Sequence, residues 1–385
     1  MKFIRGCVYF GLVATLALLI LFGIVTDRSY TGIHASIRYR VENIFEDMPI
    51  SPHIRQAHFY YLRATNRAHF NEVTFLTDGR LMLDNLDPHY FLYERADGII
   101  ALGDYLSRRD IPFVYVRIAS KMEDNSVLPL AFSDNHSIEY SDRLINLISE
   151  AGIDTIDLRA EMMRENKDFA TAFFRMDHHW TAETALWATE IIGNHIVDQY
   201  GFEIDLGMWD YSQFESITFE RAFQGYEVSF VHGYHLYEDI TVLLPEFETE
   251  LVVEDVYGNI LATGDFANAF VPRAREENVE RFEYIDMTIP FYTFVRITNL
   301  MANNDKRVLF ITESNGMLQA TFMSLGFESL HVVYLMNMVT PGVLWNTLNM
   351  YDYDIVIMAV SDVVIAQENR PVFYQDRLYL GHPPY

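Results

Sequence analysis

VLFITESNG, residues 308–316, begins as an apolar run and ends in polar residues and a glycine. The sequence predicts a buried strand over 307–312, followed by a helix from about Asn315 to Leu325. Ser314 then lies at the carboxyl end of the strand and the amino end of the helix, where α/β sheets bind ligands. A serine at this point has two explanations. It is a nucleophile beside backbone N–H groups that stabilise an oxyanion, or it is only the N-cap of the helix.

The segments around this stretch alternate between strand and helix patterns. Strands are predicted in IPFVYVRIAS, IDTIDL, SLHVVYLM and YDIVIMAV, and segments with helical spacing separate them. Such alternation predicts a three-layer α/β/α domain with a mostly parallel sheet. Residues 203–290 interrupt it with a period-two pattern, so we expect a β-rich insertion within a domain that spans 71–385.

The composition fits a large folded domain and argues against some partners. Of the 385 residues, 50% are hydrophobic, which is enough for a sizeable core. The chain has 28 basic and 54 acidic residues, a net charge of −26, so we expect no nucleic acid as a partner. An anionic polymer is also disfavoured as a ligand. The one cysteine, Cys7, permits neither an internal disulfide nor a cysteine metal site.

The amino terminus predicts a membrane anchor. Residues 6–26 form an uncharged apolar run, and the basic residues Lys2 and Arg5 precede it. As a helix the run is long enough to cross a hydrocarbon core of about 30 Å, and no convincing cleavage site follows it. We expect a cytoplasmic tip over 1–5, a transmembrane signal-anchor over 6–26, a juxtamembrane lead-in over 27–70, and the large domain outside the cell membrane. A cleaved signal peptide is the alternative.

A second stretch, Asp177-His178-His179-Trp180-Thr181, supplies partners for the serine. In an extended segment residues i and i+2 point the same way, so Asp177 pairs with His179 while His178 faces elsewhere. A carboxylate beside an imidazole orients the ring and stabilises its protonated form, as in a catalytic triad. Thr181 is expected to cap the next helix, and Trp180 to pack as an anchor. A purely structural Asp–His pair is the alternative.

The histidines also raise the question of a metal site. Asp177, His178 and His179, with His232 and His235 elsewhere in the chain, offer a carboxylate and several imidazoles. Neither group has the i, i+4 spacing of a helical zinc motif. Adjacent histidines rarely bind one ion together, so we expect no metal, and metal-dependent hydrolysis is the weaker alternative.

The second stretch resembles the signature of the DHHW family of bacterial cell-surface proteins. That family is similar to the AlgX- and AlgJ-type alginate O-acetylation proteins of the SGNH hydrolase superfamily. Asp177, His179, Trp180 and Thr181 match the first block of that group. Ser314, in ITESNG, stands at the position of its nucleophile, and the order Asp, His, Ser along the chain also resembles the group.

Other positions match less closely. Where the group has Gly-Asp before the serine, this chain has Thr312-Glu313, a larger acid. Lys121, in VYVRIASK, resembles the lysine of a Pro-x-Lys-like segment, with Ala119 in place of proline. Phe-Gln-Gly at 223–225 is similar to a Phe-x-Gly that follows the motif helix of the group.

The resemblance implies an SGNH hydrolase-like fold and a Ser-His-Asp mechanism. Ser314 attacks an acyl carbonyl after giving its proton to His179, which Asp177 orients. The expected oxyanion or substrate contacts are Glu313, Asn315, Gly316, Lys121 and Trp180.

The activity implied is that of an extracytoplasmic, membrane-anchored O-acetyltransferase or acetylesterase acting on a polysaccharide. No cofactor is expected, because a membrane-bound O-acyltransferase (MBOAT) partner delivers the acetyl group. The alternative is an inactive glycan-binding or scaffold protein of an exopolysaccharide acetylation complex. Aromatic residues of the predicted insertion, which suit sugar stacking, favour that alternative: Tyr234, Tyr237 and Phe247.

Overall fold

The computed structural model describes residues 60–61, 64, 68–70, 73–83, 92–129, 136–231, 236–276, 279–337 and 342–362. The chain forms two compact units, Met1–Asn66 with His232–Tyr234 and Arg67–Val231 with His235–Tyr385. All elements named below belong to the second unit. The predicted tip, the signal-anchor and most of the lead-in lie outside the described residues. Within the described part of the chain, no helix has the length and apolar character needed to cross a bilayer.

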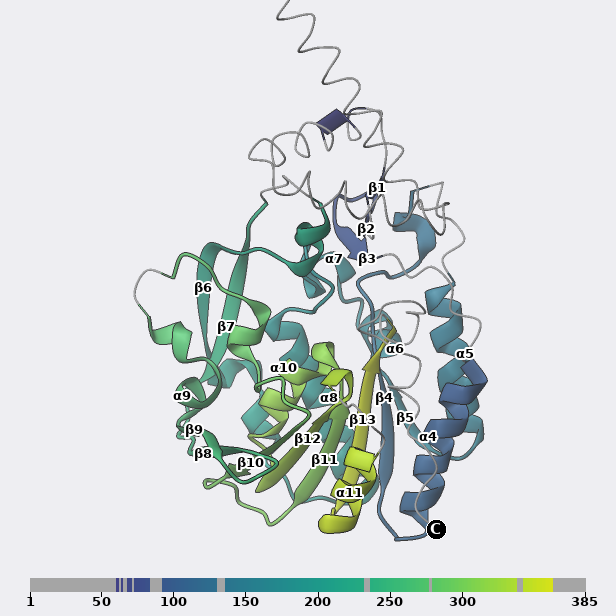
Figure 1. Ribbon diagram of the computed structural model, residues 1–385, viewed down its shortest axis with the longest axis vertical. Coiled ribbons are helices and arrows are strands. Elements are labelled where there is room, and N and C mark those ends of the chain that lie inside the picture. The colour runs from purple at the N-terminus through teal and green to yellow at the C-terminus, as the bar shows by residue number, and fades with distance from the viewer. Residues whose placement is uncertain are drawn as a thin grey trace, which may run out of the picture. The chain divides into compact units, whose positions relative to one another are not determined.

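An eight-stranded sheet forms the centre of this unit (Figure 1). Across the sheet the strands are β5 (Asp154–Asp157), β4 (Phe113–Ile118), β13 (Ile355–Ser361), β11 (Arg307–Thr312), β12 (Ser329–Tyr334), β10 (Phe294–Asn299), β8 (Leu251–Asp255) and β9 (Ile260–Gly264). The strands from β5 to β12 are parallel, and those from β12 to β9 are antiparallel to their neighbours. The predicted α/β fold with a mostly parallel central sheet is confirmed.

Helices cover both faces of the parallel strands. Parallel crossovers are right-handed, and the connection from β4 to β5 runs across the sheet in the opposite direction to that from β11 to β12. The two connecting helices, α5 (Ser137–Glu150) and α10 (Ser314–Met323), therefore lie on opposite faces.

Two further helices lie on the same face as α5, and one packs beside α10. On the face of α5 are α4 (Leu92–Ser107) and α11 (Gly342–Met350), which meet through an edge-on contact between Tyr105 and Trp345. On the other face, α8 (Ala182–Tyr200) packs against α10. Every residue of β4, β12 and β13 is buried between these layers, which explains why these strands are so apolar.

The predicted insertion is rich in strands but is not a separate body. Strands β6 (Phe214–Phe223) and β7 (Glu238–Pro245) form their own antiparallel pair, whereas β8 and β9 extend the central sheet through β10. The sequence pattern did not anticipate this extension. It supplies hydrogen-bond partners to the far side of β10, which is otherwise an open sheet edge.

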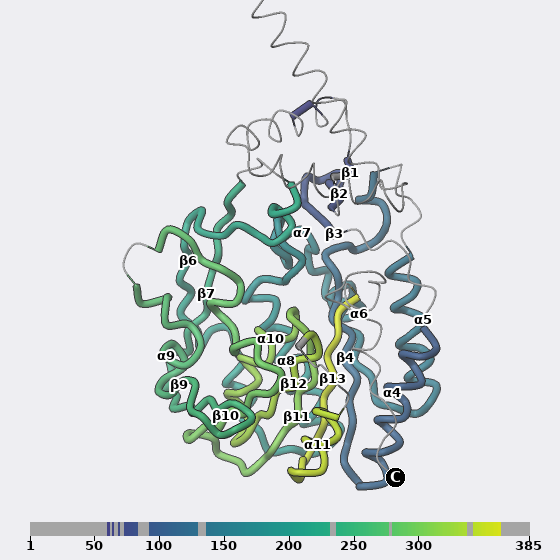
Figure 2. The backbone as a smooth tube through the Cα atoms, viewed as in Figure 1, coloured from purple at the N-terminus to yellow at the C-terminus, as the bar shows by residue number. Residues whose placement is uncertain are grey.

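Smaller elements surround the carboxyl ends of the parallel strands. A three-stranded sheet consists of β1 (His69–Phe70), β2 (Val73–Phe75) and β3 (Leu81–Leu83). The short helices α6 (Leu158–Arg164) and α7 (Phe169–Ala172) also lie here, whereas α9 (Phe266–Phe270) packs on β8 and β9 at the antiparallel edge of the sheet. Figure 2 shows β3 beside α7, and the N–H of Leu81 donates to the carbonyl of Arg175 at 2.8 Å. The small sheet thus supports the loop that carries the Asp–His motif.

Candidate active site

The loop between α7 and α8 carries the Asp–His motif and is closed at its base. Phe173 and Trp180 form an antiparallel bridge, and the N–H of Phe174 donates to the carbonyl of His179 at 3.1 Å. The side chain of Trp180 is completely buried, as expected for an anchor. The loop therefore holds its residues in a fixed turn at the entrance to α8.

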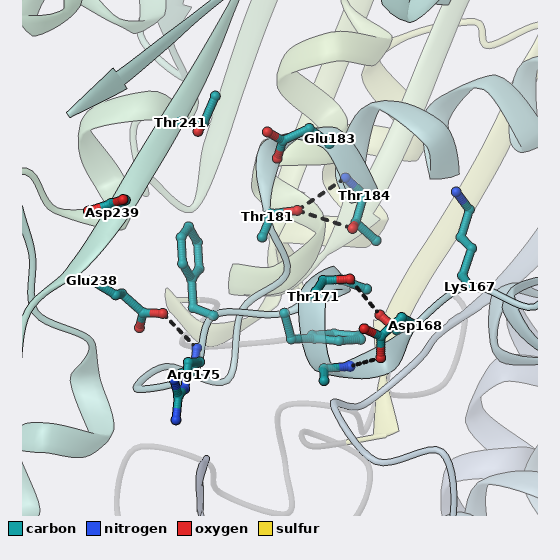
Figure 3. A pocket seen from close by; sticks show the side chains of 14 residues that line it. Lys167, Asp168, Thr171, Arg175, Thr181, Glu183, Thr184, Glu238, Asp239 and Thr241 are labelled. Atoms are coloured by element: carbon teal, nitrogen blue, oxygen red, sulfur yellow. Dashed lines mark hydrogen bonds between the residues drawn. The ribbon is translucent and has the colours of Figure 1, made fainter. Parts of the chain in front are cut away.

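A polar cavity lies beside the two ends of this loop and is lined in part by Phe173 and Thr181 (Figure 3). There Thr181 caps α8 by accepting the N–H of Thr184 at 3.4 Å, so the predicted cap is confirmed. The carboxylate of Glu238 accepts the N–H groups of Arg175 and Met176, each at 2.8 Å. Glu238, from β7, thus secures the backbone immediately before Asp177.

Asp177 and His179 form the predicted pair. Oδ1 of Asp177 lies 2.5 Å from Nδ1 of His179 and also accepts the backbone N–H of His179 at 3.0 Å. Oδ2 accepts the N–H of Tyr226 at 2.6 Å. The Nε2 atom of His179 is buried and has no hydrogen-bond partner among the described residues. This nitrogen is therefore available to take a proton from a nucleophile.

The extended geometry predicted that His178 faces away from Asp177 and His179, and this prediction is wrong. Residues 175–179 form turns and bends, so the i, i+2 rule for strands does not apply to the neighbouring side chain. The ring of His178 packs on that of His179 with centroids 4.0 Å apart. Its Nδ1 lies 3.7 Å from Oδ1 of Asp177.

Gly225, in the Phe-Gln-Gly segment, allows Tyr226 to reach Asp177. A Cβ atom at Gly225 would lie only 2.0 Å from the carbonyl oxygen of Met176 and 2.7 Å from Cβ of Asp177. The two backbone segments touch here, and only glycine fits. The close contact of Gly225 with the Asp–His motif thus places the N–H of Tyr226 where it can donate to Asp177.

Ser314 is the first residue of α10, not its N-cap. Glu313 is the cap, and its completely buried carboxylate accepts the N–H of Asn315 at 3.0 Å and the N–H of Ser361 at 3.2 Å. The Ser314 hydroxyl donates to the same carboxylate at 3.3 Å. The larger acid therefore joins the end of β11 to β13 and also accepts a hydrogen bond from the serine.

The cap changes which groups can bind an oxyanion. The backbone N–H of Asn315 donates to the Glu313 carboxylate, and that of Gly316 donates to the Glu313 carbonyl at 3.0 Å. Both expected amide donors are thus engaged, because an N-cap uses the first free N–H groups of its helix. Gly316 is needed for close packing, since a Cβ there would lie 1.8 Å from Oγ1 of Thr312.

One cavity of about 460 Å³ brings together the three residues expected to form a triad. Asp177, His179 and Ser314 all line it. Tyr284, which sequence reasoning missed, links His179 to Asn315, the residue after Ser314. Its ring stacks on His179 with centroids 3.8 Å apart, and its hydroxyl donates to the carbonyl of Asn315 at 3.3 Å. Tyr284 thus holds the imidazole against the start of α10. Nothing in its local sequence distinguishes it from the other tyrosines.

None of the five expected contact residues is among those that line this cavity: Glu313, Asn315, Gly316, Lys121 and Trp180. Lys121 is buried and donates from Nζ to the carbonyl of Leu81 and, at 3.2 Å, to that of Phe174. It joins β3 to the motif loop and does not line the cavity, so the expected substrate contact is not found. Trp180 also does not line it.

Burial and neighbouring charges set the protonation of the pair. Burial raises the pKa of the Asp177 carboxyl, but His179, His178 and the N–H of Tyr226 together hold it well below its ordinary value. Burial and His178 lower the pKa of His179 to about 4, against the opposing effect of Asp177. At neutral pH Asp177 is therefore ionised and His179 is uncharged, as a general base must be.

The same groups are poorly arranged for a metal ion. Donor atoms of Asp177, His178 and His179 lie within 4.8 Å of one another. Both oxygens of Asp177 already accept N–H groups, and Nδ1 of His179 faces Asp177. These internal hydrogen bonds favour a proton-transfer pair over a ligand set. His232 and His235 lie outside the described residues.

Comparison with known proteins supports the fold. The family model of the SGNH hydrolase-like domain of acetyltransferase AlgX matches residues 90–212, which include Asp177 and His179. PatB1 of Bacillus cereus, solved with a sulfonyl adduct, is 16% identical, with a TM-score of 0.62 over 81% of this chain and 98% of PatB1. A DHHW family protein from Eubacterium siraeum is 14% identical, with a TM-score of 0.56 over 78% of this chain and 94% of that protein. No curated protein sequence matches the chain. The resemblance expected from the motif is confirmed, and the chain has the SGNH hydrolase-like fold.

Proposed function

We propose that this protein is a serine-dependent O-acyltransferase that acetylates a cell-surface or exported polysaccharide. The observation that carries the proposal is the shared cavity, in which Ser314 lies with a His179 whose Nε2 is unoccupied and whose Nδ1 is held by Asp177. The match to an AlgX-type acetyltransferase domain supports the class of reaction.

The mechanism follows from these positions. The Ser314 hydroxyl leaves Glu313, gives its proton to Nε2 of His179, and attacks the acyl carbonyl of the donor. Asp177 stabilises the imidazolium that forms. The imidazolium returns the proton to the departing group, which leaves an acyl-serine. A sugar hydroxyl, deprotonated by His179, then attacks the acyl carbonyl and regenerates the serine; water in its place gives esterase activity.

The oxyanion needs donors other than the two amides that Glu313 occupies. The backbone N–H of Ser314 is the first candidate, because the described part of the chain provides no acceptor for it. Gln224 lines the cavity and carries a side-chain amide that offers a second N–H.

The setting of the enzyme is part of the proposal. An anchor over 6–26 would place the domain outside the cell membrane, beside a membrane-bound O-acyltransferase partner that supplies acetyl groups. No cofactor is needed for the serine chemistry. The net charge of −26 favours a neutral acceptor glycan over a polyanionic one.

The test is hydrolysis of an activated acetate ester, together with labelling by a small sulfonyl fluoride. Ser314→Ala should lower kcat/KM by about 10³-fold or more, and the label should map to Ser314 by peptide mass spectrometry. Ser229→Ala is a matched control, because Ser229 lines the same cavity while its hydroxyl donates to the Tyr226 carbonyl. Equal rates in the wild type and Ser314→Ala would leave the glycan-binding or scaffold alternative.

A further inference from the structure

A buried group of charges behind Asp177 has no part in the mechanism above. Glu227 follows Tyr226 in the chain and is completely buried. Its Oε1 lies 3.5 Å from Nδ1 of His178 and 3.9 Å from Nζ of Lys121. Neither carboxylate oxygen has a hydrogen-bond partner within the described residues. Burial raises the pKa of Glu227, so its carboxylate stays ionised only with positive charge nearby.

With both carboxylates ionised and Lys121 charged, the charges of the group balance when His178 is protonated. Asp177 and Glu227 are buried acids, and Nζ of Lys121 lies 3.9 Å from Glu227. Burial raises the pKa of Glu227 and lowers that of Lys121, and the attraction between the two groups opposes both shifts. His179 is uncharged at neutral pH. One further positive charge is needed, and His178 lies within 4 Å of both carboxylates.

We propose that His178 and Glu227 form a second imidazole–carboxylate pair, in which protonated His178 is a positioning residue that sets how readily His179 takes a proton. The inference rests on the proposed triad, because it concerns the base of that triad. It explains why the motif has two adjacent histidines, of which only the second holds the hydrogen bond from Nδ1 to Asp177.

The charge on His178 acts in opposite directions on the two triad residues. Its Nδ1 lies beside Oδ1 of Asp177, so it stabilises the carboxylate. Its ring lies against the ring of His179, so it opposes a second positive charge there. His179 therefore stays uncharged in acidic solution and remains a competent base.

Other charged groups near the pair act with it. Burial lowers the pKa of His178, but Glu227 first, then Asp177 and the more distant Glu313, raise it above its ordinary value. Lys121 opposes protonation of His179. Arg281 and Glu283 also line the cavity and bind each other at 3.1 Å.

The test measures the pH dependence of kcat/KM for an activated acetate ester and titrates the histidines by NMR. His178→Asn removes the charge, so the midpoint of the acid limb, and the pKa of His179, should rise by about one pH unit or more. His178→Lys restores a positive charge and should return the midpoint toward the wild-type value. The quantity compared between variants is the pH at the midpoint of the acid limb, not the maximum value of kcat/KM.

Glu227→Gln tests the other half of the pair. Burial lowers the pKa of His178, and the Glu227 carboxylate is the main group that raises it. Without that carboxylate the pKa of His178 should fall, and the residue should be uncharged at pH 7. His195→Asn is the matched control, because His195 binds Asp154 at 2.6 Å through Nε2 and lies outside the cavity. It should leave both midpoints unchanged.

Two results would overturn the proposal. One is a His178 that titrates at or below the ordinary histidine value in the wild type. The other is an acid limb that stays in place in His178→Asn. If Ser314 proves unnecessary for ester cleavage, the proposed function fails, yet the NMR titrations still decide whether His178 is the charged partner of Glu227.

Discussion

Replacing Gly225 with alanine tests how the Asp177 carboxylate of the proposed triad is held. The backbone of Gly225 has φ −63° and ψ 161°, which any residue adopts, so alanine adds no backbone strain. It adds a Cβ atom 2.0 Å from the carbonyl oxygen of Met176, whereas real Cβ contacts stay beyond 3.0 Å. The two segments must therefore separate by about 1 Å.

The movement has a calculable effect on Asp177. The hydrogen bond from the Tyr226 N–H to Oδ2 of Asp177, now 2.6 Å, would lengthen to about 3.6 Å, beyond hydrogen-bonding range. A hydrogen bond to a charged group contributes about 1.5–3 kcal/mol. A displacement of about 1 Å in a catalytic group costs about 10²-fold in rate. We expect kcat to fall about 10²-fold in protein that remains folded.

The assay compares kcat for an activated acetate ester with the melting temperature of each variant. Gly201→Ala is the control, because Gly201 has φ +66° at the end of α8 and a Cβ added there would meet no other atom within 4 Å. It should lower stability by about 1 kcal/mol and leave kcat unchanged. A folded Gly225→Ala with kcat within about threefold of the wild type would refute the reasoning.

Further predictions concern protonation, capping, stacking and metal. Burial lowers the pKa of His179 from 6.5 to about 4, so between these pH values the unfolded chain binds a proton that the folded chain does not. The free energy of unfolding should therefore fall as the pH is lowered from 6.5 to 4. Urea titrations of His179→Asn should show a smaller fall. Glu313→Gln should destabilise the protein by about 2 kcal/mol in thermal melts, because its charged hydrogen bonds to backbone N–H groups are weakened. Tyr284→Phe keeps the ring on His179 and should retain kcat within about threefold, whereas Tyr284→Ala should lose about tenfold. Dialysis against a chelator should leave ester hydrolysis unchanged, and a loss restored by zinc would favour the metal alternative.

Local pattern was sufficient for much of the fold and for the central pair. The apolar run before Ser314 and its alternation with helices predicted the parallel strands, because a strand buried on both faces must be apolar along its whole length. Asp177 and His179 are two residues apart, so their pairing needs only a short loop. Thr181 as a cap follows from the same local chemistry.

The remaining parts of the site depend on contacts between distant segments. Glu227 lies beside His178 although 49 residues separate them along the chain, and Tyr284 contacts both His179 and Asn315. No periodicity encodes such contacts, because they arise only when β6, the turn before β10 and α10 converge at one end of the sheet. The sequence by itself determined which strands are buried and which carboxylate and imidazole form a pair. The tertiary structure decided how that pair is charged, held and surrounded, because burial and electrostatic effects depend on distance in space and not along the chain.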